Sequence, residues 1–310
     1  MKPLVVILGP TAVGKTSVGI QLCQKIHGEI VSGDSMLIYK DMNIGTAKPS
    51  LAERQHIPHH MIDLLNPSEA YNVAEFQAKA TCCIEDIQQR GNIPILLGGT
   101  GLYVRAIVEG YQFCPASSND TLRKQLQAEV DKYGNQYLWD KLNAIDPVTA
   151  KRLHFNDQRR IIRAIEVYQN TGAPLSSQYQ ADHNIPYDLA LIGLTMPREL
   201  LYERINHRVD TMIESGLESE VRQLLDKGYH AEMVAMKGLG YRQMIGYIAG
   251  EYDLEYAVYL IKRDTRHFAK RQMTLFKKIS GIAWFDVSKY LSVPALVEDI
   301  YMDIAGKICI

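Results

Sequence analysis

Residues 9–16 have the types and spacing of a phosphate-binding loop. Gly9-Pro10-Thr11-Ala12-Val13-Gly14-Lys15-Thr16 fits the pattern GxxxxGK[ST]. Glycines let the backbone curl so that successive N–H groups point at one anion, and the helix that follows adds its positive end. In such a loop the lysine reaches the terminal phosphates and the threonine hydroxyl binds Mg²⁺. We therefore predict a phosphate site here, with Thr16 as a Mg²⁺ ligand.

Two further loops carry polar side chains directly after apolar runs. Asp34 lies in Gly33-Asp34-Ser35, and Thr100 lies in Gly98-Gly99-Thr100-Gly101. Ligands of open parallel sheets bind beyond the carboxyl ends of the strands, so we expect both loops to meet the phosphate loop. A carboxylate beside a polyanion repels it unless it binds Mg²⁺ or transfers a proton. Asp34 is a candidate for those roles, although Gly-Asp-Ser is also ordinary turn sequence.

The patterns around these loops predict an α/β fold with a parallel sheet. Continuous apolar runs followed by glycine indicate buried strands, and segments with helical periodicity separate them. We expect strands at residues 4–8, 29–32 and 93–97, and helices at residues 15–27 and 73–90. Strands that alternate with helices in this way are typical of a sheet covered on both faces.

The middle of the chain differs from both ends. Residues 119–171 look helical throughout, and a strand pattern returns at 187–195. We predict a P-loop NTPase-like core with C-terminal helices, formed by residues 1–119 and 187–310, and an all-helical insertion domain over residues 120–186. A long helix is expected from about 253 to 278, and a last strand at 282–285.

Composition excludes several classes of protein. The 310 residues carry 34 Lys+Arg against 35 Asp+Glu, which excludes a strongly basic protein that coats nucleic acid. The five cysteines, at 23, 82, 83, 114 and 309, have no CxxC spacing, so we expect reduced thiols in a cytoplasmic protein. No apolar run has the length of a membrane helix, so no membrane partner is expected. Nothing demands more than a monomer.

Two stretches are basic despite the neutral total. Residues 151–163 hold five basic residues against one aspartate, and residues 262–278 hold seven against one. Lys262, Arg266 and Lys270 are spaced four apart and share a helix face. Such a face could bind nucleic acid phosphates, or it could be an ordinary solvated face.

Other signals for chemistry are weaker. His56, His59 and His60 form HxxHH, but no neighbouring Cys or His completes a metal site, so structural histidines are the better interpretation. The strand predicted at 93–97 ends in glycines instead of the aspartate that helps hold Mg²⁺ in many NTPases. No NKxD guanine signature is present.

Motifs along nearly the whole chain resemble those of the tRNA dimethylallyltransferases, also called tRNA isopentenyltransferases. The phosphate loop is the first of them. The others follow in family order: Asp34-Ser35-Met36 with Tyr39, residues 44–49, residues 94–103, Asn156-Asp157, Arg159-Arg160, Arg163-Ala164, Glu166-Val167, Gly240-Tyr241-Arg242-Gln243 and Ala269-Lys270-Arg271-Gln272.

The resemblance implies a prenyl transfer to RNA. The family moves the dimethylallyl group of dimethylallyl diphosphate to N6 of adenosine 37, beside the anticodon of certain tRNAs, with the help of Mg²⁺. Residues 9–16 would then hold the diphosphate. By analogy Asp34 is the general base, Thr100 contacts the reacting region and Lys15 stabilises the departing diphosphate.

The family pattern also implies contacts with the anticodon stem-loop of tRNA. These fall on Asp34, Ser35, Met36, Leu37, Thr100, Arg123, Gln158, Arg159, Arg160, Ile161, Ile162, Gly240, Tyr241, Arg242, Gln243, Lys270, Arg271, Gln272 and Lys277. The basic stretches at 151–163 and 262–278 coincide with part of this set. The target base must leave the stack to react, and the helical insertion would clamp the stem-loop from the far side.

Three positions depart from the family pattern. Phe155 stands where members usually carry Pro, Leu275 replaces a Trp, and Leu37 stands where many members have Gln. We therefore do not expect the stacking contact of the Trp or the side-chain contact of the Gln.

Two other function classes share these features. A small-molecule P-loop kinase with a helical lid would turn over ATP without RNA. A non-catalytic RNA-binding module would bind RNA even after loss of Lys15 and would consume no phosphate donor.

Overall fold

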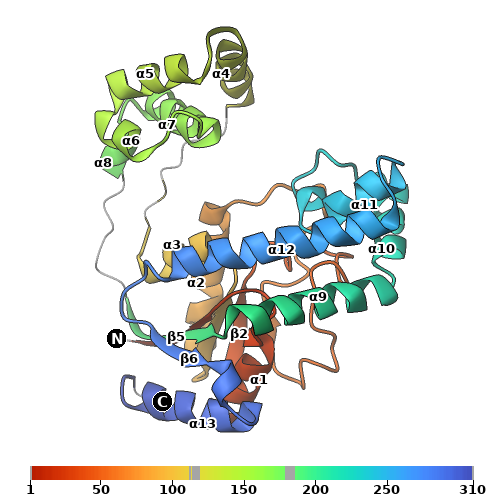
Figure 1. Ribbon diagram of the computed structural model, residues 1–310. Helices are drawn as coiled ribbons and strands as arrows, with labels where there is room; N and C mark the ends of the chain where they lie inside the picture. Colours follow the sequence, from red (N-terminus) through yellow and green to blue (C-terminus); the bar gives the residue numbers. More distant parts are fainter. Residues whose placement is uncertain (1, 112, 114–118, 179–185, 309–310) are drawn as a thin grey trace. The chain divides into compact units, whose positions relative to one another are not determined.

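A computed structural model describes residues 2–111, 113, 119–178 and 186–308 (Figure 1). The chain divides into two compact units, Met1–Val108 with Pro186–Ile310 and Glu109–Ile185. The sequence placed the start of the insertion at residue 120. Asn119 belongs with the helical unit because its backbone N–H donates to the buried Glu166 carboxylate at 2.8 Å.

The described part of the larger unit forms a six-stranded sheet in which every strand pair is parallel. The order is β3-β2-β4-β1-β5-β6. The strands are β1 (Lys2–Leu8), β2 (Gly28–Gly33), β3 (His59–His60), β4 (Ile93–Gly98), β5 (Tyr187–Thr195) and β6 (Ala283–Asp286). The predicted α/β class with a parallel sheet and a phosphate loop after the first strand is confirmed.

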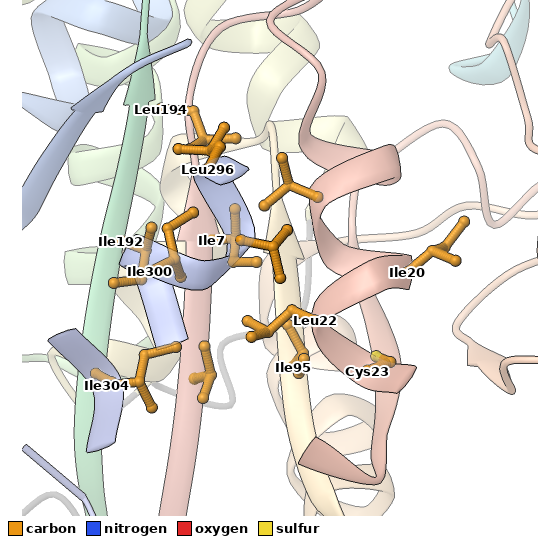
Figure 2. Close-up of a cluster of buried hydrophobic side chains, with 14 of the residues drawn as sticks. Ile7, Ile20, Leu22, Cys23, Ile95, Ile192, Leu194, Leu296, Ile300 and Ile304 are labelled. Atoms are coloured by element: carbon orange, nitrogen blue, oxygen red, sulfur yellow. The ribbon is translucent and has the colours of Figure 1, made fainter. Parts of the chain in front are cut away.

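The apolar runs form strands because both of their faces are covered. Ile7 of β1, Ile95 of β4 and Ile192 of β5 are completely buried. They face α1 (Lys15–Ile26) and α13 (Val293–Ala305), and Ile300 of α13 closes this layer (Figure 2). Alternate strand residues point to the opposite face of the sheet. There α2 (Val73–Gln89) contacts β2 and β4, and α3 (Gly101–Val108) contacts β4.

Helices make up most of the chain after β5. They are α9 (Arg198–Glu214), α10 (Leu217–Asp226), α11 (Tyr241–Ile248) and α12 (Leu254–Phe276). Asp253 caps α12 by accepting the N–H of Tyr256. The predicted helix from about 253 to 278 is therefore confirmed, with an end two residues earlier.

The insertion builds a hydrophobic core of its own. Its helices are α4 (Asp120–Tyr133), α5 (Asn135–Ile145), α6 (Pro147–Arg152), α7 (Gln158–Thr171) and α8 (Leu175–Gln178). Leu126, Leu138 and Ile161 are among the residues that fill its centre. Pro147 stands at the first position of α6 and Asp146 caps that helix.

The thiols of Cys23, Cys82 and Cys83 are free, and burial raises the pKa of Cys23 to about 12. Cys114 and Cys309 lie outside the described residues. Of the helices in the described ranges, none is both long enough and apolar enough to span a bilayer.

Candidate active site

The phosphate loop connects β1 to α1, and its shape depends on its two glycines. Gly14 has φ 104°, which only glycine adopts easily, and it directly precedes α1. A Cβ at Gly9 would lie 2.6 Å from the carbonyl oxygen of Leu194 in β5. The remaining residues, Pro10, Thr11, Ala12 and Val13, complete the turn between β1 and α1, and Val13 anchors it with a buried side chain. The sequence motif thus forms the predicted strand–loop–helix unit.

Lys15 lies over this loop. Its Nζ donates hydrogen bonds to the carbonyl oxygens of Gly9 and Pro10, both at 2.8 Å. Burial lowers the pKa of Lys15 to about 8; the Asp34 carboxylate opposes this shift and Arg208 adds to it. A desolvated ammonium group of this kind binds an anion strongly, because little water competes for it.

The loops that follow β2 and β4 are tied together beside the phosphate loop. Gly33 and Gly98 pair at the strand ends, and the N–H of Thr100 donates to the Gly33 carbonyl at 3.3 Å. The hydroxyl Oγ1 of Thr100 accepts the N–H of Ser35 at 3.1 Å. All three predicted loops therefore meet at the carboxyl edge of the sheet.

Asp34 lies at the centre of this edge. Its Oδ1 accepts the N–H of Met36 at 2.8 Å. Its Oδ2 and Lys15 Nζ would lie 3.4 Å and 4.0 Å from a Cβ placed on Gly99. Among the described residues, no cation comes within 4.0 Å of the Asp34 carboxylate. Asp34 therefore keeps acceptor capacity for a ligand.

Two hollows open at this edge and share a wall. The first has a volume of about 380 Å³ and is lined by the phosphate loop, including Lys15 and Thr16. The second has about 250 Å³ and is lined by Ser35, Met36 and Thr100, together with residues of α9, α11 and α12. The residues that line both hollows are Thr11, Asp34, Thr46, Arg208 and Phe268. A ligand in either hollow would thus lie beside Asp34.

Two arginines of α9 contribute to the first hollow, and sequence reasoning missed both. Nη1 of Arg204 donates to the Val13 carbonyl at 3.5 Å, and Arg208 lines both hollows. Burial lowers the pKa of the Arg208 guanidinium, and Asp34 opposes that shift. The available signal was their spacing of four residues on a helix whose Leu201 and Ile205 face the core.

Comparison with known proteins identifies the family of this site. The chain matches the sequence model of the IPP transferase family over residues 37–279 and that of isopentenyl transferase over residues 2–66. The chain belongs to the IPP transferase family. It is 47% identical to the tRNA dimethylallyltransferase of Alkaliphilus metalliredigens over 98% of both chains, and 50% identical to that of Carboxydothermus hydrogenoformans over 92% of both.

Solved structures of transferases from this family have the same fold. The tRNA isopentenylpyrophosphate transferase of Bacillus halodurans aligns with a TM-score of 0.73 and 41% identity, over 99% of this chain and 98% of that one. A eukaryotic dimethylallyltransferase acting on tRNA aligns with a TM-score of 0.84 and 30% identity, over 100% and 81%.

The positions for which the family pattern implied RNA contacts fall into exposed and buried sets. In this IPP transferase, Arg242 and Arg271 are exposed and line the second hollow, and Leu37 lines the first. Tyr241 is completely buried, and its hydroxyl donates to Glu220 Oε1 at 2.7 Å.

Two glutamines of this set are also buried. Oε1 of Gln243 accepts the N–H of Gly240 at 3.0 Å, and its amide nitrogen donates to Asp264. Gln272 is hydrogen bonded to Thr11 of the phosphate loop and to Gly99 of the loop after β4. Each of these two amides already has hydrogen-bond partners within the protein. The tRNA contacts expected from them stay predictions.

The basic stretch of α12 is not a uniform surface. Lys262 pairs with Asp210 at 2.6 Å, Arg263 with Asp264 at 2.8 Å, and Arg266 donates to Asn206 at 2.7 Å. The exposed basic residues toward the end of the helix are Lys270, Arg271, Lys277 and Lys278.

The basic residues of the insertion divide in the same way into paired and exposed ones. Arg123 and Arg163 both pair with the buried Glu166, at 2.8 Å and 2.6 Å. Ile161 and Ile162 fill the core of the insertion. The polar residues at the start of α7 are accessible: Arg159 and Arg160 are exposed, and Gln158 donates to Asn135 at 2.7 Å. RNA contacts in this unit are thus best expected from the first turn of α7.

Two of the three histidines have hydrogen-bond partners within the protein. His60 Nε2 lies 2.7 Å from Glu29 Oε2, and His59 Nδ1 lies 2.8 Å from the carbonyl oxygen of Ile57. His56 is exposed. Within the described ranges, no group of three or more His, Cys, Asp or Glu residues gathers as a metal site would require.

Proposed function

We propose that this chain transfers the dimethylallyl group of dimethylallyl diphosphate to N6 of adenosine 37 in tRNA. The products are N6-dimethylallyladenosine and diphosphate. The observation that carries the proposal is the position of Asp34 in the wall between two hollows. One hollow has the lining of an anion site, and the other lies beside the basic, exposed residues of α11 and α12.

The reaction needs one bond to form and one to break. N6 of adenine attacks C1 of the dimethylallyl group while the bond from C1 to the diphosphate oxygen breaks, and that electron pair leaves with the diphosphate. The attacking amine loses a proton, which Asp34 accepts on its carboxylate. Asp34 suits this role because it borders both hollows and its carboxylate accepts the backbone N–H of Met36 alone among the hydrogen bonds of the described site.

The departing diphosphate gains negative charge, and the first hollow supplies the compensating groups. Lys15 and Arg208 supply two positive charges, and burial lowers the pKa of both groups. A bound anion therefore stabilises the charged form of each. The phosphate loop adds backbone N–H groups and the positive end of α1. These groups are fixed before the reaction, which is the arrangement that stabilises a developing anion best.

The residues present fit a Mg²⁺ ion that is shared with the substrate. The hydroxyl of Thr16 lines the first hollow and is a hard oxygen donor. Magnesium usually takes only one or two protein ligands and completes its shell with phosphate oxygens and water. When bound, Mg²⁺ would supply further charge stabilisation to the leaving diphosphate.

The second hollow is the proposed entry for the adenine base. A base must leave the stack before an enzyme can act on it, and the flipped base then occupies a pocket. Arg242 and Arg271 at this hollow would bind the RNA backbone, together with Lys270 of α12 and Lys277 directly after that helix. We propose the helical unit, whose described helices are α4 to α8, as a second RNA-binding part.

One chain is sufficient in this proposal. Both hollows are lined by residues of a single compact unit, so we propose a monomer. Because its substrate is tRNA, we propose that it acts in the cytoplasm.

The test uses the full chain with radiolabelled dimethylallyl diphosphate, Mg²⁺ and unmodified tRNA. We expect label in the tRNA, mapped to adenosine 37, and none in a transcript with guanosine at that position. A parallel incubation with ATP tests the kinase alternative. ATP consumption with a small acceptor, and no label in RNA, would contradict the proposal. RNA binding with no transfer from the wild-type chain would favour the non-catalytic module.

A further inference from the structure

Gln272 of α12 is a buried side chain that bridges two catalytic loops. Its Oε1 accepts the N–H of Thr11 in the phosphate loop at 2.9 Å. Its Nε2 donates to the carbonyl oxygen of Gly99, in the loop that carries Thr100, at 2.7 Å. Only 5% of the residue is exposed. Both ends of its amide are therefore used inside the protein.

The contact needs an amide specifically. Thr11 presents a donor and Gly99 presents an acceptor, and a glutamine amide offers the complementary pair on one planar group. When a buried polar group loses its hydrogen-bond partner, the loss of stability exceeds the net free energy of that hydrogen bond. No neutral side chain of similar length other than glutamine satisfies both loops at neutral pH.

The same part of α12 packs on the glycine loop. A Cβ at Gly101 would lie 2.3 Å from Leu275 Cδ2, and Phe276 is completely buried. The position of Gly99 and Thr100 relative to the phosphate loop therefore depends on α12 through Gln272 and its neighbour Leu275.

We propose that Gln272 is a positioning residue for the prenyl transfer and does not act as an RNA contact. It sets the distance between the loop that holds the leaving diphosphate and the loop that carries Thr100, beside Asp34. This inference rests on the proposed function. A shift of about 1 Å between reacting groups can cost on the order of 100-fold in rate.

The principal test is Gln272→Met, which keeps the length of the side chain and removes both hydrogen bonds. With both substrates saturating, we expect kcat to fall about 10- to 100-fold, while the KM for tRNA stays within about twofold. An unchanged kcat would overturn the proposal. A rise in the KM for tRNA with unchanged kcat would overturn it in favour of an RNA contact.

Gln272→Glu gives a readout that a purely structural role would not move. A neutral carboxylic acid has the donor and acceptor arrangement of the amide, whereas a carboxylate cannot donate to Gly99. The charged groups that line the same hollow are Lys15, Asp34, Arg204 and Arg208, with His59 as a further titratable group. We expect the ratio of variant to wild-type kcat to rise as pH falls, because protonation of the introduced carboxylate restores the donor to Gly99. A ratio that is flat with pH would contradict the proposal.

Gln88→Met is the matched control. Gln88 of α2 donates one hydrogen bond to the carbonyl of Pro3, at 2.9 Å, at the end of β1 away from the phosphate loop. We expect this variant to retain wild-type kcat and to lose at most a few degrees of Tm. Thermal unfolding of all variants shows whether each is folded. Wild-type transfer in the same assay separates this inference from the proposed function: absence of transfer by the wild type refutes the latter, and full activity of folded Gln272→Met refutes the former.

Discussion

The two ends of β2 each hold a carboxylate, and the two have opposite surroundings. At the amino end, the buried Glu29 accepts hydrogen bonds from Arg90 and Asn92, both at 2.7 Å, and lies 2.7 Å from His60. Burial alone would raise the pKa of Glu29, but these hydrogen bonds prevail and lower the pKa to about 2. Every acceptor position of this carboxylate has a partner.

Just beyond the carboxyl end, Asp34 accepts one backbone N–H and borders two hollows. The comparison shows how a carboxylate with a structural role differs from the proposed base just beyond the other end of the strand. A carboxylate with satisfied acceptors stabilises the fold, whereas one with spare acceptors at a cavity can take a proton from a ligand.

The largest effect is expected at Asp34, the proposed base. Asp34→Asn keeps the shape and removes the base, so we expect kcat to fall about 100- to 10,000-fold while tRNA still binds. Single-turnover transfer measures the chemical step, and filter binding measures the RNA affinity. Turnover close to that of the wild type would exclude Asp34 as the base. Glu29→Gln is the paired control and should keep the wild-type rate per folded molecule.

The next effect concerns Lys15. Lys15→Met should lower kcat/KM for dimethylallyl diphosphate about 100-fold, because the hollow loses a charge aimed at the leaving group. Burial lowers the pKa of Lys15 from 10.5 to about 8, so its ammonium is present below pH 8 and is lost as pH rises through that value. In the wild type, kcat/KM should therefore fall about tenfold per pH unit above this point. A profile that stays flat well above pH 8 would show that the charge of Lys15 is not needed.

At the structural end, the expected effect is on stability. Glu29→Gln should lower the free energy of unfolding by about 2 kcal/mol, because the buried side chain loses its charge-assisted hydrogen bonds with Arg90 and His60. The pKa of Glu29 is lowered from 4.5 to about 2 in the folded state, so its stabilisation is full above pH 4.5 and is lost as pH falls toward 2. Urea unfolding at several pH values measures this loss. An equally steep acid dependence in the variant would assign it to other groups.

The smallest effect is expected at the RNA side of the second hollow. Arg271→Ala should raise the KM for tRNA about 3- to 10-fold and reduce the salt dependence of binding by about one charge. Lys262→Ala is the matched control on α12, because Lys262 is already paired with Asp210. Equal effects of the two substitutions would mean that the whole helix face, and not its exposed end, binds RNA.

The elements that sequence predicted well are those with local signals. The strand at 187–195 was predicted with both ends correct, and α1 begins at the predicted Lys15. The last strand lies one residue later than expected, at 283–286 in place of 282–285, because a run of four residues does not determine where a strand begins and ends. The two-residue β3 was not predicted, since two residues have no periodicity.

Only the part of the site that is formed by loops at the ends of strands could be predicted from the sequence. The three loops at the sheet edge follow from the rule for parallel strands. Arg208 and the bridging role of Gln272 do not, because they arise from contacts across the fold: Gln272 bonds to Thr11, 261 positions earlier in the chain. No local pattern contains such a pairing.

The sheet order also constrains the order of events during synthesis. The central strand β1 is made first, but its neighbour β5 lies beyond the insertion and is made after residue 186. Until then β1 has an open edge, with unpaired backbone groups that can pair with other chains. The insertion is contiguous and has its own core, so it can fold while the ribosome is still completing the sheet. A chain that terminates before β5 would be released with the phosphate loop formed on a sheet that lacks β5 and β6.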